Sequence, residues 1–263
     1  MLKKRLIPKL LLKKRQVGAL SRMVLVTTRA FDQVIEIGDP ISQAKIYEAQ
    51  FADELIFLNL DATPIDADAP LIELLRRAAS ETFMPIAVGG GVRSTADFDV
   101  LLDNGADKVC VNSGAIADPS LIERAAAIFG AQCVVVSIDY RHLPDGTARV
   151  FARGGREATA LDPVDWAVRA AALGAGEILL TDIDRDGGGA GLDVALIRNV
   201  ADRVRVPVIA AGGCGLAQHF VSGFVDGHAE AVAAGTFFCF RDQNPMQTRA
   251  QVRNAGVAIR VRT

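Results

Sequence analysis

Glu54-Leu-Ile-Phe-Leu-Asn-Leu-Asp61 and Glu177-Ile-Leu-Leu-Thr-Asp-Ile-Asp184 are two versions of one short segment, separated by an offset of 123 residues. Each begins with a glutamate, continues as an apolar run and ends in an aspartate. The pair Gly89-Gly90 recurs as Gly212-Gly213 at the same offset. Similarity at one long spacing indicates an internal duplication. We therefore expect the chain to fold as two halves of related structure.

Short apolar runs alternate with amphipathic stretches along the whole chain. Runs of this length, rich in Val, Ile, Leu and Ala, are typical of parallel strands buried on both faces. The candidate strands are Leu6–Leu12, Glu54–Leu60, Ile86–Val88, Lys108–Val111, Val134–Ile138, Glu177–Thr181, Val208–Ala210 and Ala231–Ala234. Eight such strands alternating with helices predict a closed parallel barrel. Because 263 residues match the roughly 250 of one such domain, we expect an α/β fold, a single (β/α)8 TIM barrel over residues 1–263, with a twofold half-barrel repeat.

Composition argues against several classes of protein. A formal net charge of −2 gives no basic surplus for nucleic acid. The four cysteines lie far apart, which disfavours zinc and disulfides and suits a reducing cytoplasm. No apolar run approaches the ~18 residues of a membrane span, and no cleavage site follows the basic segment that ends at Arg15. We expect a cytoplasmic protein with no nucleic-acid or membrane partner, no metal and no cofactor.

Polar residues that end the apolar runs are the candidates for chemistry, because active sites of this fold lie at the carboxyl ends of the strands. Asp139 ends the run Val134–Ile138 and could act as a general acid or base. Asp186 and Gly187 follow the run that begins at Glu177 and could form a mobile substrate loop. The ordinary alternatives are a carboxylate satisfied by loop amides and a polar turn.

Glycine turns follow two of the predicted strands and lead into helices. Glycine lets the backbone approach a ligand, and the start of a helix offers free N–H groups to an anion. The candidate phosphate contacts are Gly89, Gly90, Asn112 and Ser113 in the first half and Gly212, Gly213 and Gly235 in the second. Either loop alone could be a tight turn without a ligand. Two loops at matched positions favour a ligand that carries two phosphates.

Four charged residues stand near the starts of strands, at the opposite face of the predicted barrel. They are Arg5, Glu54, Lys108 and Glu177. Charges at that face usually serve stability. Taken alone, the residues therefore favour a structural ring of ion pairs.

The segments MLKKRLIP, GDPISQAKIY, VGGGVRS, GADKVCVNSGAIADPSLI and GAGEILLTDIDRDG together resemble the cyclase subunit of imidazole glycerol phosphate synthase, the HisF family. The resemblance covers nearly the whole chain. It implies a heterodimer with a HisH-like glutaminase subunit of the class I amidotransferase type. It also implies that ammonia enters at the base, crosses the barrel and attacks a phosphorylated small molecule at the mouth. In that case the four charged residues are an ammonia gate rather than a structural ring, and the glycine-turn residues contact phosphate.

The chain departs from the family pattern at the mouth. The family places one aspartate at the end of strand 1 and another at the end of strand 5. The second is Asp139, but Leu11 stands at the first position and cannot carry a proton. Losing a positioned acid or base typically costs ~10²- to 10⁴-fold in rate. Asn59 also replaces an expected aspartate, and the segment from Lys13 to Gly38 is longer than in the family.

Several functions remain open on this sequence. The chain differs from the family at the mouth of the barrel but keeps the four charged residues at its base. In this it resembles the HisF-like paralogues of surface-polysaccharide biosynthesis. That resemblance implies delivery of ammonia to an N-acetyl sugar to form an acetamidino sugar. The alternatives are the histidine-pathway synthase, rescued by another acid such as Asp61 or Asp186, and a non-catalytic scaffold that activates a glutaminase. A sugar-phosphate isomerase of the sister barrel family is a further alternative, which Leu11 disfavours.

Overall fold

Eight parallel strands close into a barrel in the computed structural model, which describes residues 3–240 and 243–260. Each strand pairs with the next around the ring, and β12 pairs with β1 from Arg5–Ala231 to Pro8–Ala234. The barrel strands are β1 (Arg5–Val17), β4 (Leu55–Asn59), β5 (Ile86–Gly89), β6 (Lys108–Val111), β7 (Val134–His142), β10 (Glu177–Asp182), β11 (Val208–Ala211) and β12 (Ala231–Ala234). The predicted (β/α)8 barrel is thus confirmed.

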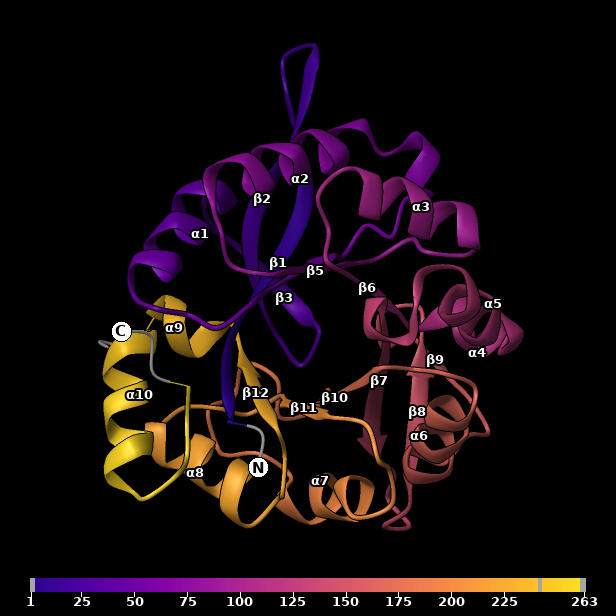
Figure 1. Ribbon diagram of the computed structural model, residues 1–263. Helices are drawn as coiled ribbons and strands as arrows, with labels where there is room; N and C mark the ends of the chain where they lie inside the picture. The colour runs from indigo at the N-terminus through magenta and orange to yellow at the C-terminus, as the bar shows by residue number, and fades with distance from the viewer. Residues whose placement is uncertain (1–2, 241–242, 261–263) are drawn as a thin grey trace.

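Helices surround the barrel on the outside (Figure 1). They are α1 (Pro40–Ala49), α2 (Ala69–Glu81), α3 (Thr95–Asp103), α5 (Ser120–Phe129), α6 (Pro163–Ala172), α7 (Val194–Ala201), α8 (Ala217–Val225) and α10 (Pro245–Asn254), with the short α4 (Ser113–Ala117) and α9 (Thr236–Phe240). Among the described residues, none of these helices is both long and apolar enough to cross a membrane.

Strand alternation divides the apolar side chains into two layers, because successive residues of a strand point to opposite faces. On β1, the side chains of Leu6, Leu10 and Leu12 join the large core between the strands and the helices. Ile7 instead belongs to a separate cluster inside the barrel. This interior layer is buried and consists of Ile7, Ile56, Ala87, Cys110, Val135, Leu179, Ile209, Ala211, Ala231 and Ala233. The barrel interior is therefore packed with apolar side chains at this level.

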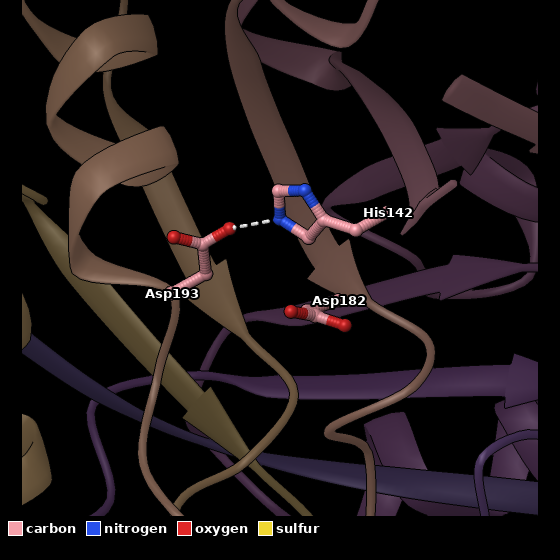
Figure 2. A group of neighbouring side chains, drawn as sticks. All are labelled: His142, Asp182 and Asp193. Carbon is pink, nitrogen blue, oxygen red and sulfur yellow. Dashed lines mark hydrogen bonds and ion pairs between the residues drawn. The ribbon is translucent and has the colours of Figure 1, made fainter. Parts of the chain in front are cut away.

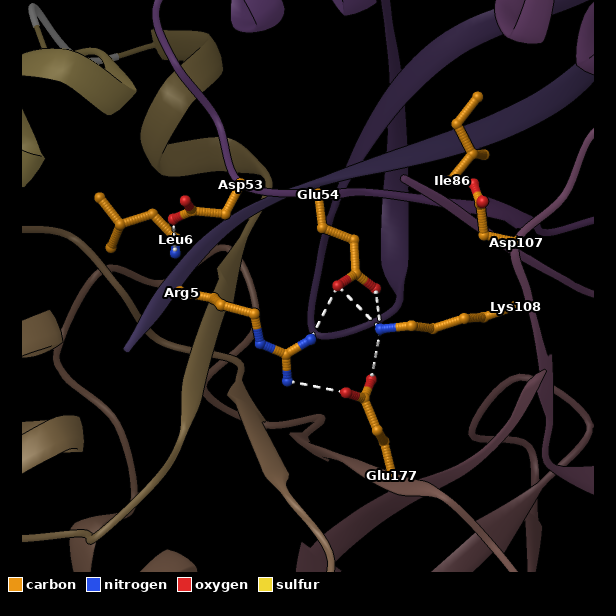
Figure 3. Close-up of polar contacts among 8 residues, drawn as sticks. All are labelled: Arg5, Leu6, Asp53, Glu54, Ile86, Asp107, Lys108 and Glu177. Atoms are coloured by element: carbon orange, nitrogen blue, oxygen red, sulfur yellow. Dashed lines mark hydrogen bonds and ion pairs between the residues drawn. The ribbon is translucent and has the colours of Figure 1, made fainter. Parts of the chain in front are cut away.

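The twofold repeat appears in the hydrogen bonds at the base of the barrel. The amide of Ile86 donates to Asp107 Oδ2 at 2.8 Å (Figure 3). The amide of Val208 donates to Glu230 Oε2 at 3.0 Å in the other half. In both cases a carboxylate that precedes one strand caps the start of its neighbour.

The glycine turns also match between the halves, but one residue away from the predicted alignment. A Cβ on Gly90 would lie 2.2 Å from the carbonyl oxygen of Asn59, and a Cβ on Gly212 would lie 2.3 Å from that of Asp182. Gly90 has a φ of +100° and Gly212 a φ of +87°, which other residues rarely adopt. Gly90 is therefore the counterpart of Gly212, and the proposed pairing of Gly89 with Gly212 was wrong.

Two antiparallel extensions were not predicted. β2 (Leu20–Arg29) and β3 (Asp32–Gly38) extend β1, whose hairpin with β2 projects beyond the ring of helices (Figure 1). β8 (Ala148–Ala152) and β9 (Glu157–Ala158) extend β7 in the same way. The residues between Lys13 and Gly38 are thus a long hairpin and a third strand rather than a simple loop.

Candidate functional site

The four charged residues at the base form a closed ring of ion pairs (Figure 3). Arg5 lies 2.7 Å from Glu54 and 2.9 Å from Glu177. Lys108 Nζ lies 2.9 Å from the same glutamate, Glu54, and 3.0 Å from Glu177. Burial alone would lower the pKa of Arg5, but the two glutamates outweigh it and raise that pKa. The ring lies directly beneath the apolar interior layer, because Arg5 precedes Ile7 on the inward face of β1.

A ring of this kind is weak evidence for stability. The side chains of Arg5, Glu54 and Glu177 are at most 11% exposed. Removing such charges from water costs free energy that their attraction only partly repays, and well-packed apolar residues are often as stable. A functional role at the base therefore gains weight over a purely structural one.

Asp139 lies at the other end of the barrel, among groups that set its protonation. Asn112 Nδ2 donates to Asp139 Oδ2 at 2.7 Å, and Ser137 Oγ donates to Oδ1 at 3.4 Å. Burial raises the pKa of Asp139 to about 6, against the opposing effects of the Lys9 ammonium and the Asn112 hydrogen bond. A carboxyl with a pKa near neutrality can exchange protons at physiological pH, as a general acid or base must.

Asp186 faces the mouth and pairs with a lysine that the sequence analysis did not select. Lys9 Nζ lies 3.1 Å from Asp186 Oδ1, and Lys9 is 3% exposed. Thr28 Oγ1 donates to Asp186 Oδ2 at 3.2 Å. The signal for Lys9 was its position, since it lies four residues after Arg5 and therefore on the same inward face of β1.

The second-half glycine turn lines a small cavity beside this ion pair. Gly212 and Gly213 contribute to its wall, as does Gly235 at the end of β12. The remaining lining residues are Lys9, Asp186, Gly187, Cys214, Ala233, Ala234, Thr236 and Phe237. The structure thus brings together four of the predicted binding glycines, Gly187, Gly212, Gly213 and Gly235, with Asp186.

The predicted contacts of the first half are arranged differently. Asn112 Nδ2 also donates to the carbonyl oxygen of Phe151, and Ser113 Oγ accepts from the amide of Arg153. Both side chains are therefore tied to the β8–β9 hairpin. Gly89 ends β5 beneath Gly90, and a Cβ on Gly89 would lie 2.7 Å from Cys110. Tight packing of the backbone accounts for both glycines, and their phosphate contacts stay a prediction.

Comparison with known families matches residues 5–243 to the family described as "Histidine biosynthesis protein". The chain belongs to this family.

A curated relative matches nearly the whole chain. It is a protein of Prochlorococcus marinus (strain MIT 9313), 51% identical over 261 residues, which make up 99% of each chain. Its name assigns it provisionally as subunit hisF2 of imidazole glycerol phosphate synthase. The resemblance to the HisF family is confirmed, and the identity is consistent with a HisF-like paralogue.

Leu11 stands where the resemblance to the HisF family predicts an aspartate. It is 6% exposed and packs in an apolar patch with Val24 and Val26 of β2, against the partly buried Leu58 and Leu60. An aspartate in this patch would lose hydration without gaining a partner. The patch and the added hairpin therefore belong together, because β2 supplies the side chains that cover Leu11.

Asn59 has a local explanation. Its Nδ2 donates to Asp68 Oδ2 at 2.7 Å, and Lys14 pairs with Asp68 at 3.0 Å. An aspartate at position 59 would place two buried carboxylates against each other. The amide of Asn59 instead supplies a donor to Asp68.

A group of possible metal ligands also lies beside the barrel mouth, formed by His142, Asp182 and Asp193 (Figure 2). Asp193 accepts from Leu196 N, Tyr140 Oη and His142 Nε2, the last at 2.7 Å. Asp182 accepts from two backbone amides and pairs with Arg185 at 3.1 Å. These contacts account for all four carboxylate oxygens, so a structural network explains the group.

The pKa of Asp139 gives a direct test of this electrostatic arrangement. We expect one side-chain carboxyl of ¹³C-labelled protein to titrate near pH 6 by NMR, and the Asp139→Asn variant to lose that signal. Lys9→Met should raise the pKa further, since the ammonium favours the carboxylate, and Asp186→Asn should lower it. A step that uses this carboxylate as a base should be fast above about pH 6 and slow as the pH falls below it. If the Asp139 carboxyl titrated near pH 4 and its pKa did not change in Lys9→Met, the result would contradict this arrangement.

Proposed function

We propose that this chain is the ammonia-using subunit of a glutamine amidotransferase complex, and that it modifies a phosphorylated or nucleotide-linked sugar rather than the histidine-pathway substrate. The observation that carries the proposal is the contrast between the two ends of the barrel. The base keeps its complete ring of Arg5, Glu54, Lys108 and Glu177, whereas Leu11 and its apolar patch occupy the position of one acid at the mouth.

The interior of the barrel suits the passage of ammonia rather than ammonium. Above the ring lies a layer of apolar side chains, several of them as small as Ala87 and Ala231. A neutral molecule crosses such a layer far more readily than an ion, which would lose its hydration. Passage requires the ring to open and side chains of the layer to shift. Both motions would be coupled to docking of a glutaminase at the base.

At the mouth, Asp139 is the residue that we assign to proton transfer. Ammonia that attacks an electrophilic carbon becomes positively charged and must release a proton. A carboxylate whose pKa lies near 6 can accept that proton and pass it on to a departing oxygen. The glycine turns at Gly212 and Gly235 would hold a phosphate of the acceptor at the adjoining cavity.

The histidine-pathway synthase is the second candidate, favoured by the name of the relative from Prochlorococcus marinus. This function needs a second acid at the mouth. Asp186 is engaged with Lys9 and Thr28, and Asp61 accepts from the amide of Lys14. A non-catalytic scaffold is less well supported, because it gives no reason to keep a half-buried carboxylate such as Asp139.

Turnover of the histidine-pathway substrate with ammonium salt separates the two candidates. We expect the purified chain to show no more activity than its Asp139→Asn variant, since the first acid is missing and such a loss costs ~10²- to 10⁴-fold. A histidine-pathway HisF subunit assayed in parallel is the positive control. Turnover within tenfold of that control would overturn the sugar-modifying assignment.

The base of the barrel also offers an anchor for the glutaminase. Phe83 lies between α2 and β5 at this face and is 92% exposed, with Phe51 44% exposed after α1. Exposed aromatic side chains at such a rim are typical of protein interfaces.

We expect Phe83→Ser to weaken binding of the cognate glutaminase, measured by titration calorimetry, without changing ammonium-supported turnover. Leu20→Ser, at the hairpin tip and 77% exposed, is the matched control. Equal effects of the two substitutions would contradict docking at the base.

A further inference from the structure

Lys9 has features that neither the ammonia gate nor proton transfer at Asp139 explains. It is 3% exposed, yet within residues 3–240 and 243–260 its ammonium makes one hydrogen bond, to Asp186 Oδ1 at 3.1 Å. An ammonium group can donate three. Burial of a cation with so few partners is costly, and an apolar side chain would suit the barrel interior better. The position therefore points to a binding role.

The ammonium faces space that a ligand could use. Two small cavities adjoin at the mouth, and Lys9, Asp186, Gly235 and Thr236 line both of them. One cavity runs beneath β2 towards Leu11, and the other reaches the glycine turn at residues 212–213. The Lys9–Asp186 pair thus forms a shared wall between the two. Each cavity has room for about one water molecule, so an anion the size of phosphate enters only if the pair separates.

Asp186 is held in place by the end of β2 and the turn that follows it. Thr28 Oγ1 donates to its carboxylate at 3.2 Å, and the amide of Ala30 donates to its carbonyl oxygen at 2.8 Å. Gly187 fits under this turn because a Cβ there would lie 2.2 Å from the carbonyl oxygen of Thr28. Ala30 and Phe31 have φ values of +52° and +61°, conformations that cost free energy in residues other than glycine. Displacement of Asp186 would therefore break the hydrogen bonds that join this segment to the mouth.

We propose that Lys9 Nζ binds a phosphate group of the acceptor, and that the carboxylate of Asp186 is the internal anion that this phosphate replaces. The inference rests on the proposed function, because it assigns the recognition of a phosphorylated acceptor to the same mouth. Phosphate would receive the donors of Lys9 and the backbone amides of the glycine turns. Asp186 and the β2–β3 turn would then move together, so that binding of the acceptor opens its own site.

Inorganic phosphate is the probe for this site, with binding followed by ³¹P NMR on the chain alone. Lys9→Met should weaken binding on the order of 10-fold or more, the effect of losing a hydrogen bond to a charged group. Asp186→Asn should tighten binding, because it removes a competing carboxylate. If the ion pair were merely structural, both substitutions would change the phosphate affinity in the same direction. Lys14→Met removes a lysine–aspartate pair from the same strand outside both cavities and should leave the affinity unchanged.

Two results would overturn the inference. One is wild-type phosphate affinity in the folded Lys9→Met variant, and the other is an absence of saturable binding to Asp186→Asn. Neither result would contradict the amidotransferase assignment, because the titration uses no glutaminase, ammonia or acceptor. Failure of that assignment in turnover assays would in turn leave the phosphate titration valid. The two proposals therefore fail separately.

Discussion

The alternation of side chains along β1 is the constraint on which the rest of the molecule depends. Because a strand exposes every second residue to one face, Arg5, Ile7, Lys9 and Leu11 form one inward column from base to mouth. Arg5 closes the ring of ion pairs, Ile7 belongs to the apolar layer, Lys9 pairs with Asp186, and Leu11 lies in the patch beneath β2. A shift of one residue in this strand would exchange the column with the outward leucines that hold the helices.

The two ends of the column carry different electrostatic arrangements. At the base, two cations and two glutamates satisfy one another in a ring that faces no cavity among those described. At the mouth, the single cation Lys9 interacts with two carboxylates. It pairs directly with Asp186, and it opposes the effect of burial on the pKa of Asp139. The mouth therefore has no surplus positive charge while Asp186 stays in place, and a phosphate would have to replace that carboxylate beside Lys9.

Much of this structure was predictable from the sequence, for physical reasons that also explain the failures. Strands buried on both faces read as continuous apolar runs, so all eight barrel strands were located. Asp139 was found because it follows the apolar run of β7, although that strand continues to His142. The β1–β2 hairpin was missed because Met23–Thr28 is buried on both of its faces, by the helices on one side and by Leu11 on the other. Its residues therefore form a continuous apolar run, which was interpreted as part of a longer loop. Lys9 was missed because a lysine within an apolar run suggested an interruption rather than an inward position. The repeat was found, but the alignment of its glycine turns was wrong by one residue because Gly89 extends β5 before the turn begins.

The central claim is that the base ring admits ammonia from a partner to a modified mouth. The most direct measurement is the ratio of glutamine-supported to ammonium-supported turnover in the reconstituted complex, for the wild type and for Lys108→Met. The account predicts a lower ratio for Lys108→Met. Glutamine-supported turnover requires ammonia to pass the ring, whereas turnover with free ammonium salt does not depend on the docked partner. Lys45→Met, which removes an exposed pair with Glu81, should keep the wild-type ratio. An unchanged ratio in Lys108→Met would contradict the account.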